Sequence, residues 1–184
     1  MLEDISALEN CTVSLVPDGY DAFLLAQLWE KSARDILYIV SDGVALENTA
    51  HILSVIRPEA EVLKFPAWDT VPYDRVSPNV NIVAVRIGAL SALAQNPSPK
   101  KPRIIVTSAG AAIQRLPLKK IFLNSMKNVS VGGELNFNDF VHYAVVNGYN
   151  RVEQVMEPGE YALNEFGEIE PQILLFTEDA KRRL

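Results

Sequence analysis

Cysteine and histidine are nearly absent from this sequence. Its 184 residues include one cysteine, Cys11, and two histidines, His51 and His142. A lone cysteine excludes an internal disulfide, and this supply of cysteine and histidine is too small for a Cys/His metal cluster. We therefore expect no metal site, and we expect Cys11 to be a small buried hydrophobic residue.

Long hydrophobic runs and an excess of positive charge are also missing. No segment approaches the roughly 20 consecutive apolar residues of a membrane-spanning helix. The N-terminal sequence MLEDISALEN is acidic where a signal peptide would be basic. The formal net charge of -6 is the wrong sign for a domain that grips phosphate backbones. We expect a soluble, cytoplasmic protein, in which any nucleic-acid role is indirect or local.

Hydrophobic residues make up 48% of the chain, which is enough for one sizeable core or for a domain with a smaller appendage. In the first part, apolar runs of strand length alternate with segments of helical period. The expected strands are residues 11–16, 35–40, 61–64 and 103–107, and the expected helices begin near Asp21, Asp42, Asn79 or Asn81, and Ser108. This alternation predicts an α/β fold with an open, mostly parallel sheet flanked by helices.

Beyond Pro117 the pattern changes. We expect a helix over residues 136–147, with Asn136 or Asn138 as its N-cap and Gly148 at its C-terminal end. Short strands are expected around this helix, at residues 127–131, 151–156, 161–163 and 169–176. The pattern predicts a smaller α+β domain, and we assign the two domains to residues 1–116 and 117–184.

The first candidate site is the expected strand-to-helix corner, residues 16–22, which read VPDGYDA. A working P-loop needs glycines that let backbone N–H groups face phosphate, a lysine for the β and γ phosphates, and a hydroxyl for magnesium. Asp21 stands about where the lysine belongs and Ala22 where the hydroxyl belongs, and both changes oppose that chemistry. We interpret Asp18, Gly19, Tyr20, Asp21 and Ala22 as a degenerate P-loop that binds no cofactor. The alternative is an ordinary strand-to-helix turn that is unrelated to a P-loop, and it predicts the same absence of nucleotide binding and activity.

Proline and aromatic residues are concentrated in a connection over residues 65–78. Prolines interrupt regular structure, so the segment is an irregular loop that could be a lid, a binding surface or a packed plug. We expect Trp68 and Tyr73 to be structural anchors, because aromatic side chains are mostly buried. The charged residues of the loop are expected on its solvent side: Asp69, Asp74 and Arg75. No residues of the chain form a pattern typical of catalysis, since Ser108 lacks a glycine-flanked nucleophile elbow.

The same loop carries a family resemblance. It reads FPAWDTVPYDRVSP, and the chain continues with IVAVRI at 82–87, VT at 106–107 and QRLP at 114–117. Residues 148–161 read GYNRVEQVMEPGEY. These segments resemble, in the same order, the N-terminal region of the bacterial transcription-repair coupling factors (Mfd). The similarity covers nearly the whole chain from about Val13.

The resemblance implies a non-catalytic part of a larger protein. Members of this family are ATP-driven DNA translocases that displace stalled RNA polymerase and recruit the excision-repair protein UvrA. Their N-terminal region is similar to the helicase UvrB, with a first α/β domain whose Walker motif has decayed and a second domain that contacts UvrA. The resemblance thus implies UvrA recruitment, restraint of the motor, or both. The residues expected to contact the partner are Arg151, Glu157, Glu160 and Tyr161.

The motor and polymerase-binding domains do not fit in 184 residues, so we expect an N-terminal fragment or a short relative. RNA polymerase and double-stranded DNA would bind other domains of a full-length protein. One segment departs from the family pattern: residues 162–165 lead directly into FGEIE at 166–170, where the family has about one more β-hairpin and an arginine. Loss of that hairpin would weaken or remove the contact with UvrA.

Two alternatives therefore stay open. One is a diverged paralogue that keeps the fold without binding UvrA. The other is a nucleotide-binding, helicase-type enzyme with a non-standard phosphate site. The second needs a basic group near the first turn, and residues 11–30 contain no lysine or arginine.

Overall fold

The structure is a computed structural model that describes residues 10–71, 75–95, 101–127 and 136–163. The chain divides into two compact units, residues 1–67 with 96–115 and residues 68–95 with 116–184. Several expectations fall outside the described residues: most of the strand at 127–131, the strand at 169–176, Tyr73, Asp74 and the segment 164–170.

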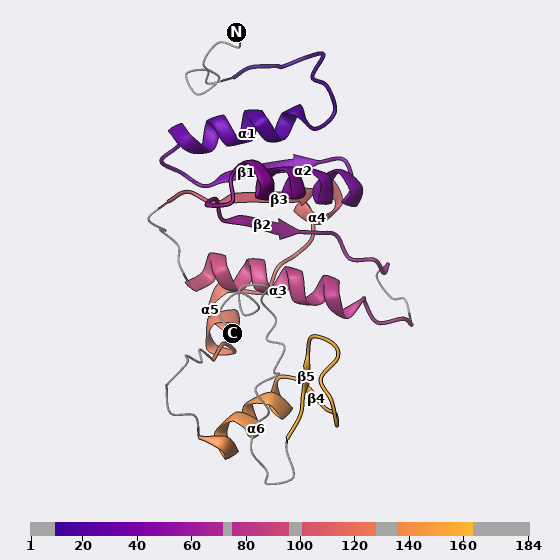
Figure 1. Ribbon diagram of the computed structural model, residues 1–184. Coiled ribbons are helices and arrows are strands. Elements are labelled where there is room, and N and C mark those ends of the chain that lie inside the picture. The colour runs from indigo at the N-terminus through magenta and orange to yellow at the C-terminus, as the bar shows by residue number, and fades with distance from the viewer. Residues whose placement is uncertain (1–9, 72–74, 96–100, 128–135, 164–184) are drawn as a thin grey trace. The chain divides into compact units, whose positions relative to one another are not determined.

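The first unit contains a parallel three-stranded sheet (Figure 1). Its strands are β1 (Ile36–Val40), β2 (Val62–Phe65) and β3 (Ile104–Ser108), in the order β1-β3-β2. Ile36 of β1 and Val62 of β2 both lie opposite Ile104 of the central strand. The helices of this unit are α1 (Tyr20–Lys31), α2 (Gly43–Ile56) and the short α4 (Ala109–Ala112). The predicted α/β fold with a parallel sheet is confirmed.

Helices α1 and α2 cover the same face of this sheet. The buried cluster that joins them to the strands consists of Ala22, Leu25, Ala26, Trp29, Leu46, Leu53, Val40, Ile104 and Val106. Full burial of a leucine side chain such as that of Leu46 or Leu53 contributes about 1.5–3 kcal/mol. The indole N–H of Trp29 donates to the carbonyl oxygen of Pro102 at 2.6 Å, so this buried ring keeps a polar partner.

The helix starts follow the local sequence signals. The Asp42 carboxylate accepts hydrogen bonds from the backbone N–H groups of Val44 and Ala45, both at 2.9 Å, and begins α2. The Ser108 hydroxyl accepts from the backbone N–H of Ala111 and begins α4. These side chains satisfy backbone donors that the first turn of a helix leaves without an internal acceptor.

The expected strand at residues 11–16 is wrong. These residues form no strand, and Cys11, which we expected to be buried, is exposed. Leu15 is 99% exposed and has a φ angle of 57°, a left-handed conformation that is unfavourable for a residue with a Cβ atom. Composition alone suggested the strand, but a strand forms only where a neighbour pairs with it.

The second unit consists of α3 (Val80–Gln95), α5 (Lys119–Asn124), α6 (Phe137–Val146), β4 (Asn150–Arg151) and β5 (Glu160–Tyr161). Helix α3 packs against α5, and β4 pairs with β5 in parallel. Asn136 is the N-cap of α6, as predicted, and Gly148 follows the helix with a φ angle of 79°. A small core forms from Phe140, Ala144 and Tyr161, with Tyr149 and Leu163 packed against it.

The domain division at residues 116 and 117 stays a prediction. In the structure, α3 groups with the C-terminal elements, whereas the sequence pattern placed it in the first domain. Within the described ranges, no helix combines the length and apolar character that crossing a membrane requires. The same ranges contain no cluster of His, Cys, Asp and Glu side chains that could hold a metal ion.

Candidate functional site

The start of α1 lies close to α2. Gly19 precedes the helix with a φ angle of 79°, and the backbone N–H of Tyr20 donates to the carbonyl oxygen of Pro17 at 3.0 Å. A Cβ atom at Gly19 would lie 2.9 Å from Cδ1 of Ile52 in α2. Both the left-handed backbone and this close approach favour glycine at the position. The turn therefore holds the first residues of α1 against α2.

Asp21 lies in the first turn of α1, and its carboxylate is bound within the protein. Its Oδ2 atom accepts a hydrogen bond from the hydroxyl of Tyr38 on β1 at 2.9 Å and another from the hydroxyl of Thr49 on α2 at 3.0 Å. The side chain of Asp21 thereby connects three elements of the first unit. A negative charge in the first turn also interacts favourably with the helix dipole.

Tyr38 remains a proton donor over a wide pH range. Burial, the hydrogen bond to Asp21 and the negative charge of that carboxylate together raise the pKa of Tyr38 to about 12. At neutral pH its hydroxyl is therefore protonated and donates to Asp21. Neither Tyr38 nor Thr49 was identified from the sequence, because they lie 17 and 28 residues from Asp21 and no local pattern links them.

The other residues of the predicted P-loop have ordinary surroundings. Ala22 is fully buried in the core, whereas Asp18 is exposed. The ring of Tyr20 stacks on that of Phe23, with centroids 5.9 Å apart. The corner thus presents carboxylates and an aromatic pair, whereas a phosphate-binding corner presents backbone N–H groups beside a lysine and a hydroxyl.

A second group of predicted site residues lies around the connection between β4 and β5. The Oε2 atom of Glu160 accepts hydrogen bonds from the backbone N–H groups of Met156 at 2.9 Å and Glu157 at 3.0 Å. These two bonds lower the pKa of Glu160. They also close the turn that contains Pro158 and Gly159.

The predicted partner-binding residues differ in accessibility. Arg151 on β4 and the side chain of Glu157 are exposed. Tyr161, which lies opposite Arg151 in the register, is only 3% exposed and belongs to the core of the second unit. Arg151 and Glu157 are thus accessible to a partner, whereas Glu160 and Tyr161 hold the segment in place.

A tryptophan of the aromatic loop lies against an arginine of α3. The guanidinium of Arg86 on α3 lies 4.1 Å from the centroid of the Trp68 ring, within range of a cation–π interaction. Arg86 is only 3% exposed, and burial lowers its pKa. Trp68 itself is 37% exposed, so it covers the arginine without being fully buried.

The charged residues of this loop that the structure describes are exposed, as expected for Asp69 and Arg75. The two carboxylate oxygens of Asp69 lie 3.1 and 3.2 Å from the backbone nitrogen of Asn79, which donates to them. The Asn79 side chain in turn accepts from the backbone N–H of Asn81 near the start of α3. This bond between Asp69 and Asn79 ties the beginning of the loop to its end.

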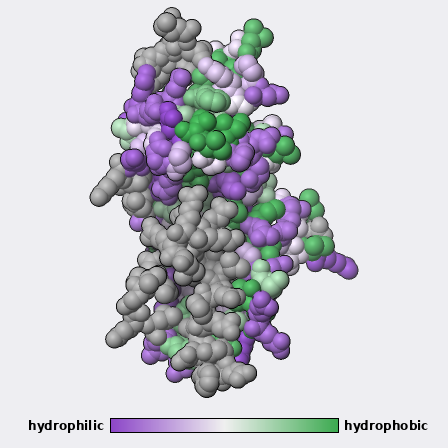
Figure 2. Space-filling view, viewed as in Figure 1, coloured by the Kyte–Doolittle hydropathy of each residue, from purple (hydrophilic) through white to green (hydrophobic). Residues whose placement is uncertain are grey.

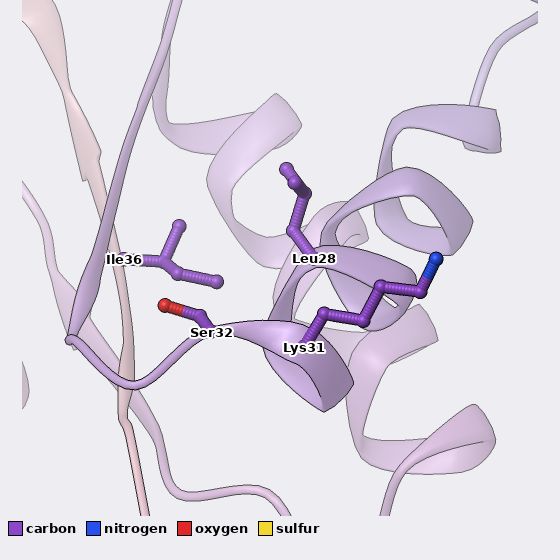
Figure 3. Close-up of a pocket in the computed structure, with 4 residues that line it drawn as sticks. All are labelled: Leu28, Lys31, Ser32 and Ile36. Carbon is purple, nitrogen blue, oxygen red and sulfur yellow. The ribbon is translucent and has the colours of Figure 1, made fainter. Parts of the chain in front are cut away.

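An open recess of about 180 Å³ lies between the end of α1 and β1 and is lined by Leu28, Lys31, Ser32 and Ile36 (Figure 3). The Ser32 hydroxyl is already engaged, since it donates to the Arg34 carbonyl oxygen and accepts from the Arg34 backbone N–H. The Lys31 ammonium points away from Ser32 and Ile36 in Figure 3. This lining provides no group of convergent polar atoms of the kind that orients a small ligand.

None of the protein-family models compared with the chain matches it. Individual proteins do match the chain in sequence. The chain is 32% identical over 153 residues to the transcription-repair-coupling factor of Rickettsia bellii, a match that covers 83% of this chain and 13% of the relative. The protein of the same name from Haemophilus influenzae is 29% identical over 145 residues, covering 79% of this chain and 12% of the relative. The protein of the same name from Escherichia coli is 29% identical over 144 residues, a match that covers 77% of this chain and 12% of the relative.

The chain thus matches about an eighth of the length of these relatives. The matches agree with the resemblance found in the aromatic loop and in residues 148–161. The chain is therefore related to a region of the transcription-repair-coupling factors.

Proposed function

We propose that this chain is a non-catalytic interaction module that acts in transcription-coupled DNA repair. In this proposal it corresponds to the UvrB-like N-terminal region of a coupling factor, recruits UvrA, and restrains the motor where the chain is part of a full-length translocase. The observation that carries the non-catalytic part is the position of Asp21. Its carboxylate lies in the first turn of α1, bound to Tyr38 and Thr49.

The charge at this position opposes nucleotide binding. Two like charges about 4 Å apart repel by about 4 kcal/mol at an effective dielectric constant of about 20. A triphosphate carries several negative charges, and no lysine or arginine in residues 11–30 would offset the repulsion. Moving Asp21 away would also break its hydrogen bonds to two hydroxyl groups, of which that of Thr49 is buried. An unpaired buried polar group costs about 1–3 kcal/mol.

The partner surface in this proposal is the connection between β4 and β5. Arg151 and Glu157 would contact UvrA, since both side chains are exposed. Glu160 would position Glu157 through its hydrogen bonds to the backbone of the turn. Tyr161 would anchor β5 in the core. RNA polymerase and double-stranded DNA remain partners of other regions of a full-length protein.

A nucleotide titration tests the non-catalytic part. We expect no saturable, magnesium-dependent binding of a fluorescent ATP analogue to the chain at concentrations up to about 1 mM, which corresponds to a binding free energy weaker than about -4 kcal/mol. The Asp21→Asn variant is the matched control, because it removes the charge while nearly preserving the shape of the side chain. Saturable binding to the unmodified chain would overturn the proposal and favour a helicase-type enzyme with a non-standard phosphate site.

A further inference from the structure

Positive charge is concentrated in one stretch of the chain, although the net charge is -6. Residues 75–133 contain nine lysine and arginine residues and no aspartate or glutamate. The rest of the chain contains eight lysine and arginine residues against 23 aspartate and glutamate residues. Two of the nine have structural roles, since Arg103 pairs with Asp35 and Arg86 lies against Trp68. The net charge therefore conceals a basic segment whose exposed residues the fold does not explain.

Exposed lysines and leucines alternate on and beside α5 of the second unit. We call this group the α5 surface, and its members are Leu116, Leu118, Lys119, Lys120, Leu123 and Lys127. The three leucines are 51%, 72% and 39% exposed, in chain order, and the three lysines are all exposed. Hydrophobic residues also lie among hydrophilic ones on the face that Figure 2 shows, so exposure alone does not mark a binding surface. The α5 surface is distinguished by its charge, because residues 116–127 contain no carboxylate side chain.

This segment is held in place within the second unit. Helix α5 packs against α3 (Figure 1). The side-chain amide of Gln95 on α3 donates to the sulfur of Met126 at 3.4 Å. The hydroxyl of Tyr143 on α6 donates to the carbonyl oxygen of Ser125 at 3.0 Å, and the Lys127 ammonium lies 5.9 Å from the centroid of the Tyr143 ring. A surface that is fixed in this way loses little conformational entropy when it binds a partner.

The stability of α5 does not account for the two lysines at its start. Partial positive charge collects at the N-terminal end of a helix, where carboxylates are favourable and ammonium groups are not. The first turn of α5 contains Lys119 and Lys120 and no acidic residue. None of the ion pairs in the described part of the chain includes either lysine. Their charge is thus available to a partner.

We propose that the α5 surface binds a protein segment in which carboxylates alternate with apolar side chains. The carboxylates of such a segment pair with the lysines, and its apolar side chains cover the three leucines. Protein interfaces combine apolar contacts at the centre with complementary charges in this way. Nucleic acid fits the surface less well, because protein–DNA interfaces are more polar and would not use the leucines. The inference does not rest on the proposed function, whose partner surface is the connection between β4 and β5.

Fluorescence anisotropy with a synthetic peptide tests the proposal. The probe is a labelled peptide of about 12 residues, roughly three helical turns, in which pairs of glutamates alternate with pairs of leucines. We expect it to bind the unmodified chain saturably, and we expect peptides with serine for leucine, or lysine for glutamate, to bind at least tenfold more weakly. No saturable binding of the probe at up to about 0.1 mM chain, or equal binding of the serine peptide, would overturn the proposal. A short DNA duplex that binds as tightly as the probe would also overturn it, and would favour a nucleic-acid site.

Two matched pairs of variants locate the binding surface. Lys120→Glu should weaken probe binding at least fivefold, whereas Arg34→Glu, at an exposed position of the first unit, should change it less than twofold. Lys120→Glu should leave α5 folded, because the helix dipole favours a carboxylate in the first turn, and circular dichroism checks this. Leu118→Ser should weaken binding at least threefold, and Val146→Ser, at a similarly exposed position of α6, less than twofold. Equal effects of a substitution and its control, in either pair, would overturn the proposal.

Discussion

Arg103 and Asp35 join the beginnings of β3 and β1, although 68 residues separate them in sequence. The Arg103 side chain donates to Oδ2 of Asp35 from Nε at 3.1 Å and from Nη2 at 2.6 Å. The backbone N–H of Arg103 donates to Oδ1 at 2.8 Å. The Arg103 side chain is buried, whereas that of Asp35 is partly exposed. This pair fixes the register of the two strands where the central strand begins.

The Asp35 carboxylate makes the stability of the first unit depend on pH. Burial alone would raise the pKa of Asp35, but the hydrogen bonds from Arg103 and its positive charge outweigh that effect and lower it. A carboxylate with a lowered pKa in the folded state stabilises the fold above its unfolded pKa of about 3.9, and the contribution is lost as the pH falls through the folded pKa. We expect Asp35→Asn to be less stable than the unmodified chain at about pH 7, with the difference narrowing below about pH 4.

Urea denaturation at several pH values measures this difference. Glu59→Gln, which changes an exposed carboxylate of the same unit, is the control and should change the stability at about pH 7 much less than Asp35→Asn does. A stability difference for Asp35→Asn that stays constant down to about pH 3 would show that the pair does not titrate as expected.

The raised pKa of Tyr38 makes the stability of the first unit depend on pH at the alkaline end of the range. Its pKa is raised to about 12 from an ordinary value of about 10. The stabilisation is therefore complete below about pH 10 and is lost as the pH rises towards the folded value. Tyr38→Phe should be less stable than the unmodified chain at about pH 9 by roughly 1 kcal/mol, the net worth of a hydrogen bond. The gap should narrow at about pH 11.

The measurement is the urea midpoint at both pH values, with Tyr20→Phe as an exposed tyrosine control. If the gap between Tyr38→Phe and the unmodified chain widens on going to high pH, the assigned direction of the pKa shift is incorrect.

Three glycines allow backbone strain to be separated from steric crowding. Gly19 and Gly148 both have a φ angle of 79°, but a Cβ atom would meet Ile52 only at Gly19, and at Gly148 no described atom lies within 4 Å. Gly148→Ala should cost about 1 kcal/mol from the left-handed backbone alone. Gly19→Ala should cost somewhat more, because the Ile52 side chain must also rotate away. Gly43→Ala, at the open first position of α2, should be neutral or stabilising by a few tenths of a kcal/mol.

Chemical denaturation of the three alanine variants measures the change in the free energy of unfolding for each, and so ranks them. Because Gly148 belongs to the second unit and the other two to the first, the unfolding of each unit should be followed with its own probe. Gly19→Ala and Gly43→Ala with equal stability would contradict the role assigned to the turn before α1.

Trp68 should stabilise the second unit less than a fully buried tryptophan does. Complete burial would make Trp68→Ala cost about 3–5 kcal/mol, but the side chain is 37% exposed, so we expect about 2 kcal/mol. Trp68→Phe keeps an aromatic face over Arg86 and should retain about half of that stability. Thermal unfolding measures both variants, and UvrA affinity of the folded protein should not change. Equal losses for the two substitutions would show that the ring over Arg86 contributes little.

Local signals in the sequence account for much of the secondary structure. Asp42 and Asn136 cap the helices that they were expected to cap, and Gly148 follows α6 with the left-handed backbone that such glycines adopt. These features depend on residues within one helical turn, so a single sequence contains the information.

Features that depend on distant residues were not predictable. The run at 11–16 has strand composition, but nothing in its sequence specifies a pairing partner, and the strand is not formed. The bonds from Tyr38 and Thr49 to Asp21, and the pair between Arg103 and Asp35, join residues between 17 and 68 positions apart. The sequence therefore identified Asp21 as unsuited to phosphate but could not show which groups hold it.

The central claim is that the chain binds a repair partner through the connection between β4 and β5, and calorimetric titration with the cognate UvrA tests it most directly. We predict saturable binding with a dissociation constant in the micromolar range, weakened at least tenfold by Arg151→Glu. Arg34→Glu, which reverses an exposed charge in the first unit, should bind like the unmodified chain. No binding of the folded chain at micromolar concentrations, or equal weakening by both variants, would contradict the account and favour a diverged paralogue that does not bind UvrA.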